Sequence, residues 1–545
     1  MKPRAGVVFA LLFLALLASR ACHLDILWEP ETLPLAAAQQ MLDGKALYRE
    51  VWYDKPPLAA AVCLLWGVQT GWLLRLVGAL YALLACALIY RFAKEAWGER
   101  EGLLAAGLLG FFLIFWLPAG VIPLGPDLLT LAPHIAAVYL AWRGRALWSG
   151  VAAGVAFLAN SKAAFVLAAC ALWQFRSLPQ LALGFVLPNL AALAWLGAQG
   201  ALKDYYQQVW QLGFLYARSP FMERPLAEGL LRTANWLGFH AALVVGAVCY
   251  GWRERDSDRW RMALWAALSL AAVAAGGRFF PRYYLQLLPV MTLAAARGIA
   301  LLGGGRILVL LALLVPLARF GPRYGLLAQD LVAGREHAWR DLAMDRDSRA
   351  AARLVAGLAR PGDTLFVWGY RPEIYVFTRL PAAARFLESQ PLTGVFADRH
   401  LAQSDSLAPE WARQNRQELM RARPTFVLDG LGPYNPRLSP ERFEDLRPWL
   451  ASYRLTARTD STLIYELQAH SAASPQIEEN QKAKGKNQKA KISAPGRGPV
   501  WGGIFRGWPQ SKLSSMTQSS MTQFLSGAGI WPPRGIFAAR EEMGL

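Results

Sequence analysis

Apolar residues occur along this chain in long blocks that short polar or basic stretches separate. Blocks of this kind favour helices that cross a membrane, because roughly 20 apolar residues span its hydrocarbon core. Basic residues collect at alternate ends of the blocks, most densely between Arg253 and Arg261, and such clusters mark the cytoplasmic side. The pattern predicts an α-helical polytopic membrane bundle of about 11 spans in residues 1–324. The expected spans are 5–18, 71–90, 102–120, 128–142, 146–159, 163–175, 181–196, 234–252, 262–275, 284–301 and 307–317.

The first block has Lys2 and Arg4 before it and Ala21 after it. This arrangement suits either a cleaved signal peptide, with its site near Ala21, or a first membrane anchor. We favour the anchor because many further spans follow and the same positive flank is natural for it. On this interpretation the N-terminus is cytoplasmic and residues 23–70 lie outside.

Residues 23–70 form a long polar interlude between the first two blocks. They contain carboxylates, a helix-like segment that ends near Leu42, and a Lys55-Pro56-Pro57 turn. Loops of this length are uncommon unless they have a function. We therefore interpret residues 23–70 as a catalytic first external loop at the membrane surface.

From about residue 325 the pattern becomes that of a soluble domain. It predicts helices at 350–359, 409–423 and 440–453 and strands at 364–369, 425–428 and 462–467. This alternation predicts a small extracytoplasmic α/β domain over residues 325–468. Residues 469–545 are rich in Lys, Gly, Ser and Pro, which predicts a disordered basic tail. That tail is either a surface-binding segment or an artefactual extension of the reading frame.

Composition agrees with a membrane protein that carries soluble appendages. Of 545 residues, 55% are hydrophobic and 17% are charged, and the formal net charge is +19. In a soluble protein this charge would favour a nucleic-acid partner, but here many arginines lie at the ends of apolar blocks. We interpret the excess of positive charge as a sign of membrane topology and of affinity for anionic membrane lipid, and we expect no nucleic-acid partner. The five cysteines are scattered, so neither a disulfide framework nor a metal site is expected.

With this topology, charged side chains from separate stretches reach the external face. Carboxylates opposite cations at a lipid boundary suit a substrate that has an anionic lipid phosphate and a group to be transferred. For Arg75, Lys162 and Arg282 the alternative is that each one anchors the end of a helix. The external set comprises Asp25, Glu29, Glu31, Asp54, Lys55, Arg75, Asp127, Lys162, Arg278 and Arg282.

Several motifs follow one another in a characteristic order. In the first external loop they are Trp28–Thr32, Gln39–Gly44, Tyr48-Arg49 and Lys55–Leu58; later come Gly125–Leu129, Lys162, Arg278–Tyr284 with Pro289, Thr364–Gly369 and Pro372–Tyr375. Together they resemble the protein-mannosyltransferase and aminoarabinose-transferase group, glycosyltransferase family 39. The resemblance extends over roughly residues 5 to 468 and implies a GT-C-like fold.

The resemblance also implies an activity. A sugar, hexosyl or pentosyl, would pass with inversion from a polyprenyl-phosphate donor to an extracytoplasmic protein, lipid or polysaccharide acceptor. A carboxylate would accept the proton of the acceptor hydroxyl, and cations would stabilise the leaving lipid phosphate. Lys55 is the best match for the phosphate contact, followed by Arg282 and Lys162, with Arg75 as a further cation. Asp127 matches the second acidic position. No cofactor is expected, and the involvement of a divalent cation stays open.

The chain departs from the family pattern at one position. Members usually carry an Asp-Glu pair where this chain has Pro30-Glu31, so a proline occupies the place of the expected catalytic aspartate. Glu31 is one candidate base, and Asp25 or Glu29 could replace it if the loop is shifted. The alternative is that Glu29 and Glu31 only stabilise the first turn of a helix through its dipole.

Two other functions compete with the enzyme. A transporter or flippase of lipid-linked sugars would also place charges in a bundle, but it predicts paired repeats and interrupted helices near mid-membrane. A noncatalytic polytopic relative is suggested by the missing aspartate. We favour the glycosyltransferase in the bacterial cytoplasmic (inner) membrane, with its catalytic loops and C-terminal domain outside.

Overall fold

The computed structural model describes residues 5–116, 123–219, 221–255, 258–302, 305–335, 339 and 342–468. Residues up to Leu467 form one compact unit. The predicted tail, 469–545, lies outside the described residues. As expected from the sequence, the described part is mostly helical and ends in a small sheet.

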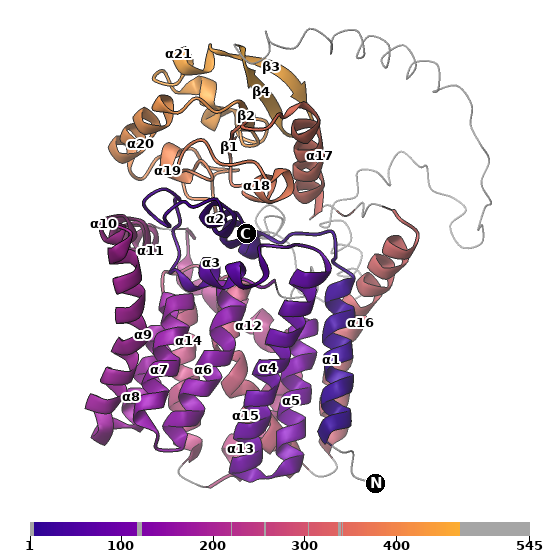
Figure 1. The fold of residues 1–545 in the computed structure, drawn as a ribbon. Coiled ribbons are helices and arrows are strands. Elements are labelled where there is room, and N and C mark those ends of the chain that lie inside the picture. Colours follow the sequence, from indigo (N-terminus) through magenta and orange to yellow (C-terminus); the bar gives the residue numbers. More distant parts are fainter. Residues whose placement is uncertain are drawn as a thin grey trace, which may run out of the picture. The chain divides into compact units, whose positions relative to one another are not determined.

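Long helices lie side by side in a bundle, with α1 against α4, α4 against α5 and α6 against α7 (Figure 1). Their apolar side chains form a continuous core between the helices. The helices of the bundle are α1 (Ala5–Ala21), α4 (Trp72–Trp97), α5 (Glu99–Ile114), α6 (Pro126–Trp142), α7 (Ala146–Ala159), α8 (Ala164–Trp173), α9 (Leu178–Ala198), α12 (Pro225–Phe239), α13 (Ala241–Arg253), α14 (Asp258–Ala274), α15 (Leu288–Leu301) and α16 (Arg306–Val332).

Within the part of the chain that the structure describes, three stretches of helix are both long and apolar enough to cross a membrane on their own: Trp72–Trp97, Phe175–Ala198 and Arg306–Val332. The expected span 234–252 is divided into α12 and α13, which meet at an angle of 90°. At the bend, the ring of His240 stacks on Trp236 with centroids 4.2 Å apart, and its Nδ1 lies 2.9 Å from the Trp236 carbonyl oxygen. Both contacts lie at the bend, which the apolar pattern does not indicate.

Two helix pairs of the bundle approach each other through glycine. A Cβ atom on Gly184 of α9 would lie 1.9 Å from the Leu147 carbonyl oxygen of α7, and one on Gly298 of α15 would lie 1.8 Å from the Gly246 carbonyl oxygen of α13. Only glycine permits such approaches, which are typical of helix pairs packed in membranes. These glycine contacts let α7 pack closely against α9 and α13 against α15.

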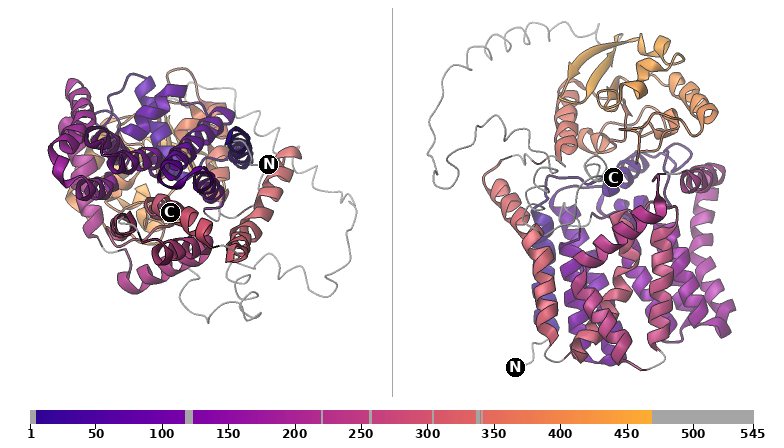
Figure 2. Two further views of the ribbon diagram at one scale, coloured as in Figure 1. Left: turned by 90° about the horizontal axis from the view of Figure 1, so that it is seen from below. Right: turned by 180° about the vertical axis from the view of Figure 1, so that it is seen from behind.

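Short elements connect the helices of the bundle. They are α2 (Glu29–Leu42), α3 (Leu58–Cys63), η1 (Leu64–Trp66), η2 (Ser161–Ala163), η3 (Phe175–Ser177), α10 (Leu202–Tyr205), the π-helix η4 (Tyr206–Gln211), α11 (Leu212–Arg218) and η5 (Pro281–Gln286). Except for η3, which joins α8 to α9, these elements connect spans on the side of the α/β domain, and Figure 1 shows α2 and α3 between the bundle and that domain. The view from behind in Figure 2 shows the same order of layers.

The α/β domain contains a four-stranded sheet in the order β1-β2-β4-β3. Strands β1 and β2 are parallel, with Leu365 opposite Phe426, and the other two neighbouring pairs are antiparallel. The elements are α17 (Ala343–Leu358), β1 (Leu365–Trp368), α18 (Glu373–Thr378), α19 (Gln390–Thr393), α20 (Pro409–Arg421), β2 (Phe426–Asp429), η8 (Pro436–Leu438), η9 (Pro440–Arg442), α21 (Arg447–Leu450), β3 (Tyr453–Arg458) and β4 (Leu463–Leu467).

Two features of this region differ from expectation. In place of the helix predicted at 440–453, the structure has the short η9 and α21, because prolines interrupt the segment. The strand β3 then begins at Tyr453 and is a largely exposed edge strand. Helix α16 runs through Pro316 and Pro322 to Val332, well past the expected end of the last span at Leu317. It therefore continues through the predicted domain boundary at residue 325.

The α/β domain is joined to the first external loop by hydrogen bonds. The Leu27 amide donates to Asp345 Oδ1 at 3.1 Å, the Ala382 amide donates to Gln40 Oε1 at 2.7 Å, and the Trp52 amide donates to the Arg385 carbonyl at 2.7 Å. These contacts come from three parts of the loop. They fix the loop between the domain and the bundle.

One buried carboxyl predicts how the stability of this domain depends on pH. Burial raises the pKa of Glu373 to about 7, against the opposing effects of Arg371 and Ser348. Its contribution to stability should be complete below the usual glutamate pKa and should be lost as the pH rises through about 7. We expect Glu373→Gln to be more protected than wild type above pH 7 and similar to it near pH 4, as measured by hydrogen exchange of the β1 and β2 amides at each pH. An equal difference at both pH values would contradict this.

Candidate active site

Charged side chains from five stretches meet where the bundle faces the α/β domain. Helix α2 provides Glu29 in its first turn, and the loop after it provides Lys55. Helix α6 provides Asp127 in its first turn. Lys162 lies in η2 and Arg282 in η5. Each of these residues was expected at the external face.

Helices α2 and α6 begin very close to each other. Gly125, which precedes α6, has no room for a side chain, because a Cβ atom there would lie 2.5 Å from the Pro30 carbonyl oxygen. Pro30 occupies the first turn of α2, a position that tolerates proline because the amides of that turn have no partner within the helix. The glycine at position 125 therefore allows the first turn of α2, which carries Glu29, to lie close to the start of α6, which carries Asp127.

Arg282 connects the two carboxylates. Its Nη1 atom lies 2.7 Å from Glu29 Oε2 and its Nε atom 4.0 Å from Asp127 Oδ2. Asn160 Nδ2 donates to Asp127 Oδ1 at 2.9 Å. Glu29 is 26% exposed and Asp127 is 17% exposed. Both carboxylates are therefore held in place and still accessible to a ligand.

Lys162 presents a cation without a matching anion in contact with it. The Asn160 side chain accepts a hydrogen bond from the Lys162 amide at 3.0 Å, which shapes the turn. The Nζ atom lies 3.2 Å from the centroid of the Tyr283 ring. It is buried, and it has no hydrogen-bond acceptor among the described residues. Burial lowers the pKa of Lys162 to about 7, against the opposing effect of Asp127, so a bound anion would favour the charged form of this side chain.

Lys55 is the most accessible cation of the group. It is 42% exposed, and its Nζ atom lies 2.8 Å from Asp54 Oδ2. Burial lowers the pKa of Lys55, but the Asp54 carboxylate outweighs this and raises it above the usual value. The Tyr48 hydroxyl donates to the Lys55 carbonyl at 2.8 Å. Lys55 is therefore held charged by Asp54, a neighbouring carboxylate that the sequence also places in the external set.

The structure separates Glu31 and Arg75 from this accessible group. Glu31 has no exposed surface, and its carboxylate accepts from Arg75 Nη2 at 2.8 Å and Nη1 at 3.1 Å. It also accepts from the backbone amides of Trp28 and Leu124. Asp25, by contrast, is exposed. All hydrogen-bonding sites of Glu31 are occupied by the protein, so this geometry suits a fixed ion pair better than a base.

The α/β domain contributes residues that the sequence did not suggest. Glu388 is buried, and burial together with the charge of Asp54 raises its pKa well above the usual value. Asp398 lies 2.9 Å from Arg278 Nε, which connects the domain to the segment that carries Arg282. Both carboxylates lie in irregular segments outside the motifs, so no periodicity or spacing could have revealed them.

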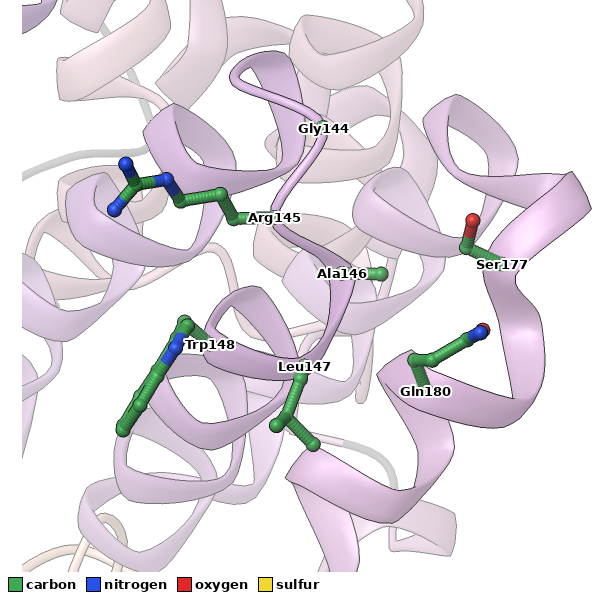
Figure 3. Close-up of a pocket in the computed structure, with 7 residues that line it drawn as sticks. All are labelled: Gly144, Arg145, Ala146, Leu147, Trp148, Ser177 and Gln180. Carbon is green, nitrogen blue, oxygen red and sulfur yellow. The ribbon is translucent and has the colours of Figure 1, made fainter.

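A separate hollow of about 430 Å³ lies at the other end of α6, around the turn that joins it to α7. Figure 3 shows Arg145 and Trp148 on one side of it and Ser177 and Gln180 on the other. It is open and shares no residue with the charged cluster. We do not include it in the candidate site.

Comparisons with known proteins show which proteins share the helical bundle, the loop at 23–70 and the small α/β domain. Residues 54–196 match the family model described as dolichyl-phosphate-mannose-protein mannosyltransferase. This match includes Lys55, Asp127 and Lys162. It confirms the resemblance that the sequence motifs indicated.

Two solved structures share the fold over most of the chain. ArnT from Cupriavidus metallidurans in the apo state has 16% sequence identity and a TM-score of 0.53, covering 87% of this chain and 100% of that chain. The same protein bound to undecaprenyl phosphate has 15% identity and a TM-score of 0.52, covering 84% of this chain and 97% of that chain. No curated protein sequence matches this chain.

Proposed function

We propose that this protein transfers a sugar from a polyprenyl-phosphate carrier to an acceptor outside the membrane, with inversion at the anomeric carbon. The observation that carries the proposal is the meeting of Lys55, Lys162 and Arg282 with Glu29 and Asp127 at one end of the bundle. An anionic leaving group and a hydroxyl nucleophile need cations and a carboxylate side by side. The site offers both.

Glu29 is the preferred base. Only its Oε2 atom is paired among the described residues, so Oε1 can accept the proton of an acceptor hydroxyl. As that oxygen forms its bond to the anomeric carbon, the bond from this carbon to the phosphate oxygen breaks. The electron pair leaves with the lipid phosphate, whose charge Lys55, Lys162 and Arg282 stabilise. Asp127 orients Arg282, and attack opposite the leaving phosphate gives inversion.

The proposal includes a location and a topology. Apolar helices and the family match support an integral membrane protein. The basic clusters support about 11 spans with a cytoplasmic N-terminus and an extracytoplasmic site, which fits the bacterial inner membrane. The acceptor class is a protein, a lipid or a cell-envelope polysaccharide, and the sugar is a hexose or a pentose.

The test is donor turnover by the purified protein in lipid. A panel of polyprenyl-phosphate sugars is offered with cell-envelope extract as acceptor, and release of free polyprenyl phosphate is measured for wild type and Lys55→Ala. Turnover that Lys55→Ala abolishes would support the enzyme and its site. Movement of intact donor across the bilayer without release would support a flippase, and tight donor binding without release or movement would support a noncatalytic relative.

Lys162→Met gives a second expected result. Because Nζ has no acceptor among the described residues, removing it leaves no group unpaired and should not lower the thermal stability. Binding of undecaprenyl phosphate should weaken by about tenfold or more, since a charge-assisted contact to phosphate contributes about 1.5–3 kcal/mol. The control is Lys203→Met, at an exposed position on α10. Unchanged binding in Lys162→Met would remove Lys162 from the phosphate site.

A further inference from the structure

We propose that Gln208 is a positioning residue for the Asp54-Lys55 pair, acting through the loop of residues 47–53. This inference rests on the proposed function, because it assigns to Gln208 the task of holding a phosphate-binding lysine. Gln208 lies about 150 residues away in sequence, between α10 and α11, and it belongs to none of the motifs discussed above.

Gln208 forms hydrogen bonds with the loop at two backbone positions. Its Oε1 atom accepts from the Tyr53 amide at 2.9 Å, and its Nε2 atom donates to the Tyr48 carbonyl at 2.7 Å. The residue is only 1% exposed. Both ends of the side-chain amide are therefore used, and both are used on the segment that leads directly into Asp54 and Lys55.

The local helix geometry explains why Gln208 points at the loop. Residues Tyr206–Gln211 form a π-helix between α10 and α11. Segments of π-helix are rare, but those that occur often lie at functional sites. Their wider turn points side chains in directions that differ from those of an α-helix. Within this segment Gln208 is buried whereas Gln211 is exposed. One segment therefore provides both the test position and a matched control.

The loop of residues 47–53 has a backbone conformation that contacts with neighbouring residues must stabilise. Tyr48 has a backbone φ of 68°, in the left-handed region that L-residues rarely adopt. Its amide donates to the Val51 carbonyl at 2.8 Å, and its ring packs against Tyr205, with centroids 5.0 Å apart. The Tyr48 hydroxyl then donates to the Lys55 carbonyl at 2.8 Å. A continuous set of contacts thus runs from Gln208 through Tyr48 to Lys55.

Only an amide can make both of these bonds. A glutamate carboxylate could accept from the Tyr53 amide but could not donate to the Tyr48 carbonyl. A methionine of similar size could do neither. We therefore expect Gln208→Met to loosen the loop most and Gln208→Glu to repel the Tyr48 carbonyl, while Gln211→Met changes nothing.

The experiment uses the full-length protein in detergent and two measurements. The first is hydrogen exchange of residues 47–55 without ligand, which should speed up in Gln208→Met and not in Gln211→Met. The second is the Kd for undecaprenyl phosphate in wild type, Gln208→Met, Lys55→Ala and the double variant. We expect Gln208→Met to weaken binding about tenfold, with no further weakening when Lys55 is already alanine, since residues that act through one contact are not additive.

The outcomes separate the two proposals. If wild type binds undecaprenyl phosphate and Lys55→Ala weakens it while Gln208→Met does not, the inference about Gln208 is wrong and the proposed function stands. Equal weakening by Gln208→Met in both backgrounds would mean a general structural role and would also overturn the inference. If wild type binds no undecaprenyl phosphate, or Lys55→Ala binds as wild type does, the phosphate site itself is refuted.

Discussion

Glu29→Gln is expected to bind the lipid-linked donor and to transfer its sugar about 10²- to 10⁴-fold more slowly than wild type, the range typical of a lost general base. The glutamine keeps the size of the side chain and can still contact Arg282, but it cannot accept a proton. The measurement is single-turnover release of polyprenyl phosphate at saturating donor. The effect should therefore appear in kcat and leave donor affinity nearly unchanged.

The controls for Glu29→Gln are Asp25→Asn and Asp127→Asn. Asp25 is exposed and should be replaceable without effect. Asp127 contacts Asn160 and Arg282, so its loss should disturb the position of Arg282 and weaken donor binding as well as turnover. Full activity in Glu29→Gln together with a pure loss of kcat in Asp127→Asn would identify Asp127 as the base.

Glu31→Gln is expected to lower the stability of the protein by about 3–5 kcal/mol, because removing one partner of a buried ion pair leaves the other charge uncompensated. Arg75 is 2% exposed and Glu31 is 0% exposed, so water cannot replace the lost carboxylate. Thermal unfolding in detergent measures the change. The exposed pair of Arg49 and Glu50 supplies the control: Glu50→Gln should change stability by about 1 kcal/mol or less.

The sequence predicted the class of fold because the apolar blocks and the alternating basic ends are direct consequences of membrane insertion. It predicted β1, β2 and β4 because buried strands are rich in β-branched and aromatic residues. It did not predict the bend at His240, because the apolar pattern continues through that position. Strand β3 was also missed, because its exposed polar residues resemble those of a surface helix.

The candidate site was predicted in part for similar reasons. Topology placed Lys55, Asp127, Lys162 and Arg282 on one face, and the structure brings them together. The sequence could not rank Glu29 against Glu31, because they are two residues apart and differ only in which way each points from α2. It also gave no sign of Gln208 or Glu388, whose roles depend on contacts between distant segments.

The hydrogen bonds between the first external loop and the α/β domain determine when the loop can be completed during synthesis. The partners of Leu27 and Gln40 lie 318 and 342 residues later in the chain. At the usual elongation speed of about 5–20 residues per second, the ribosome needs roughly 20 to 70 s to reach them. These hydrogen bonds of the loop can therefore form only after almost the whole unit has been translated. Assembly of the site is among the final events in the biogenesis of this protein.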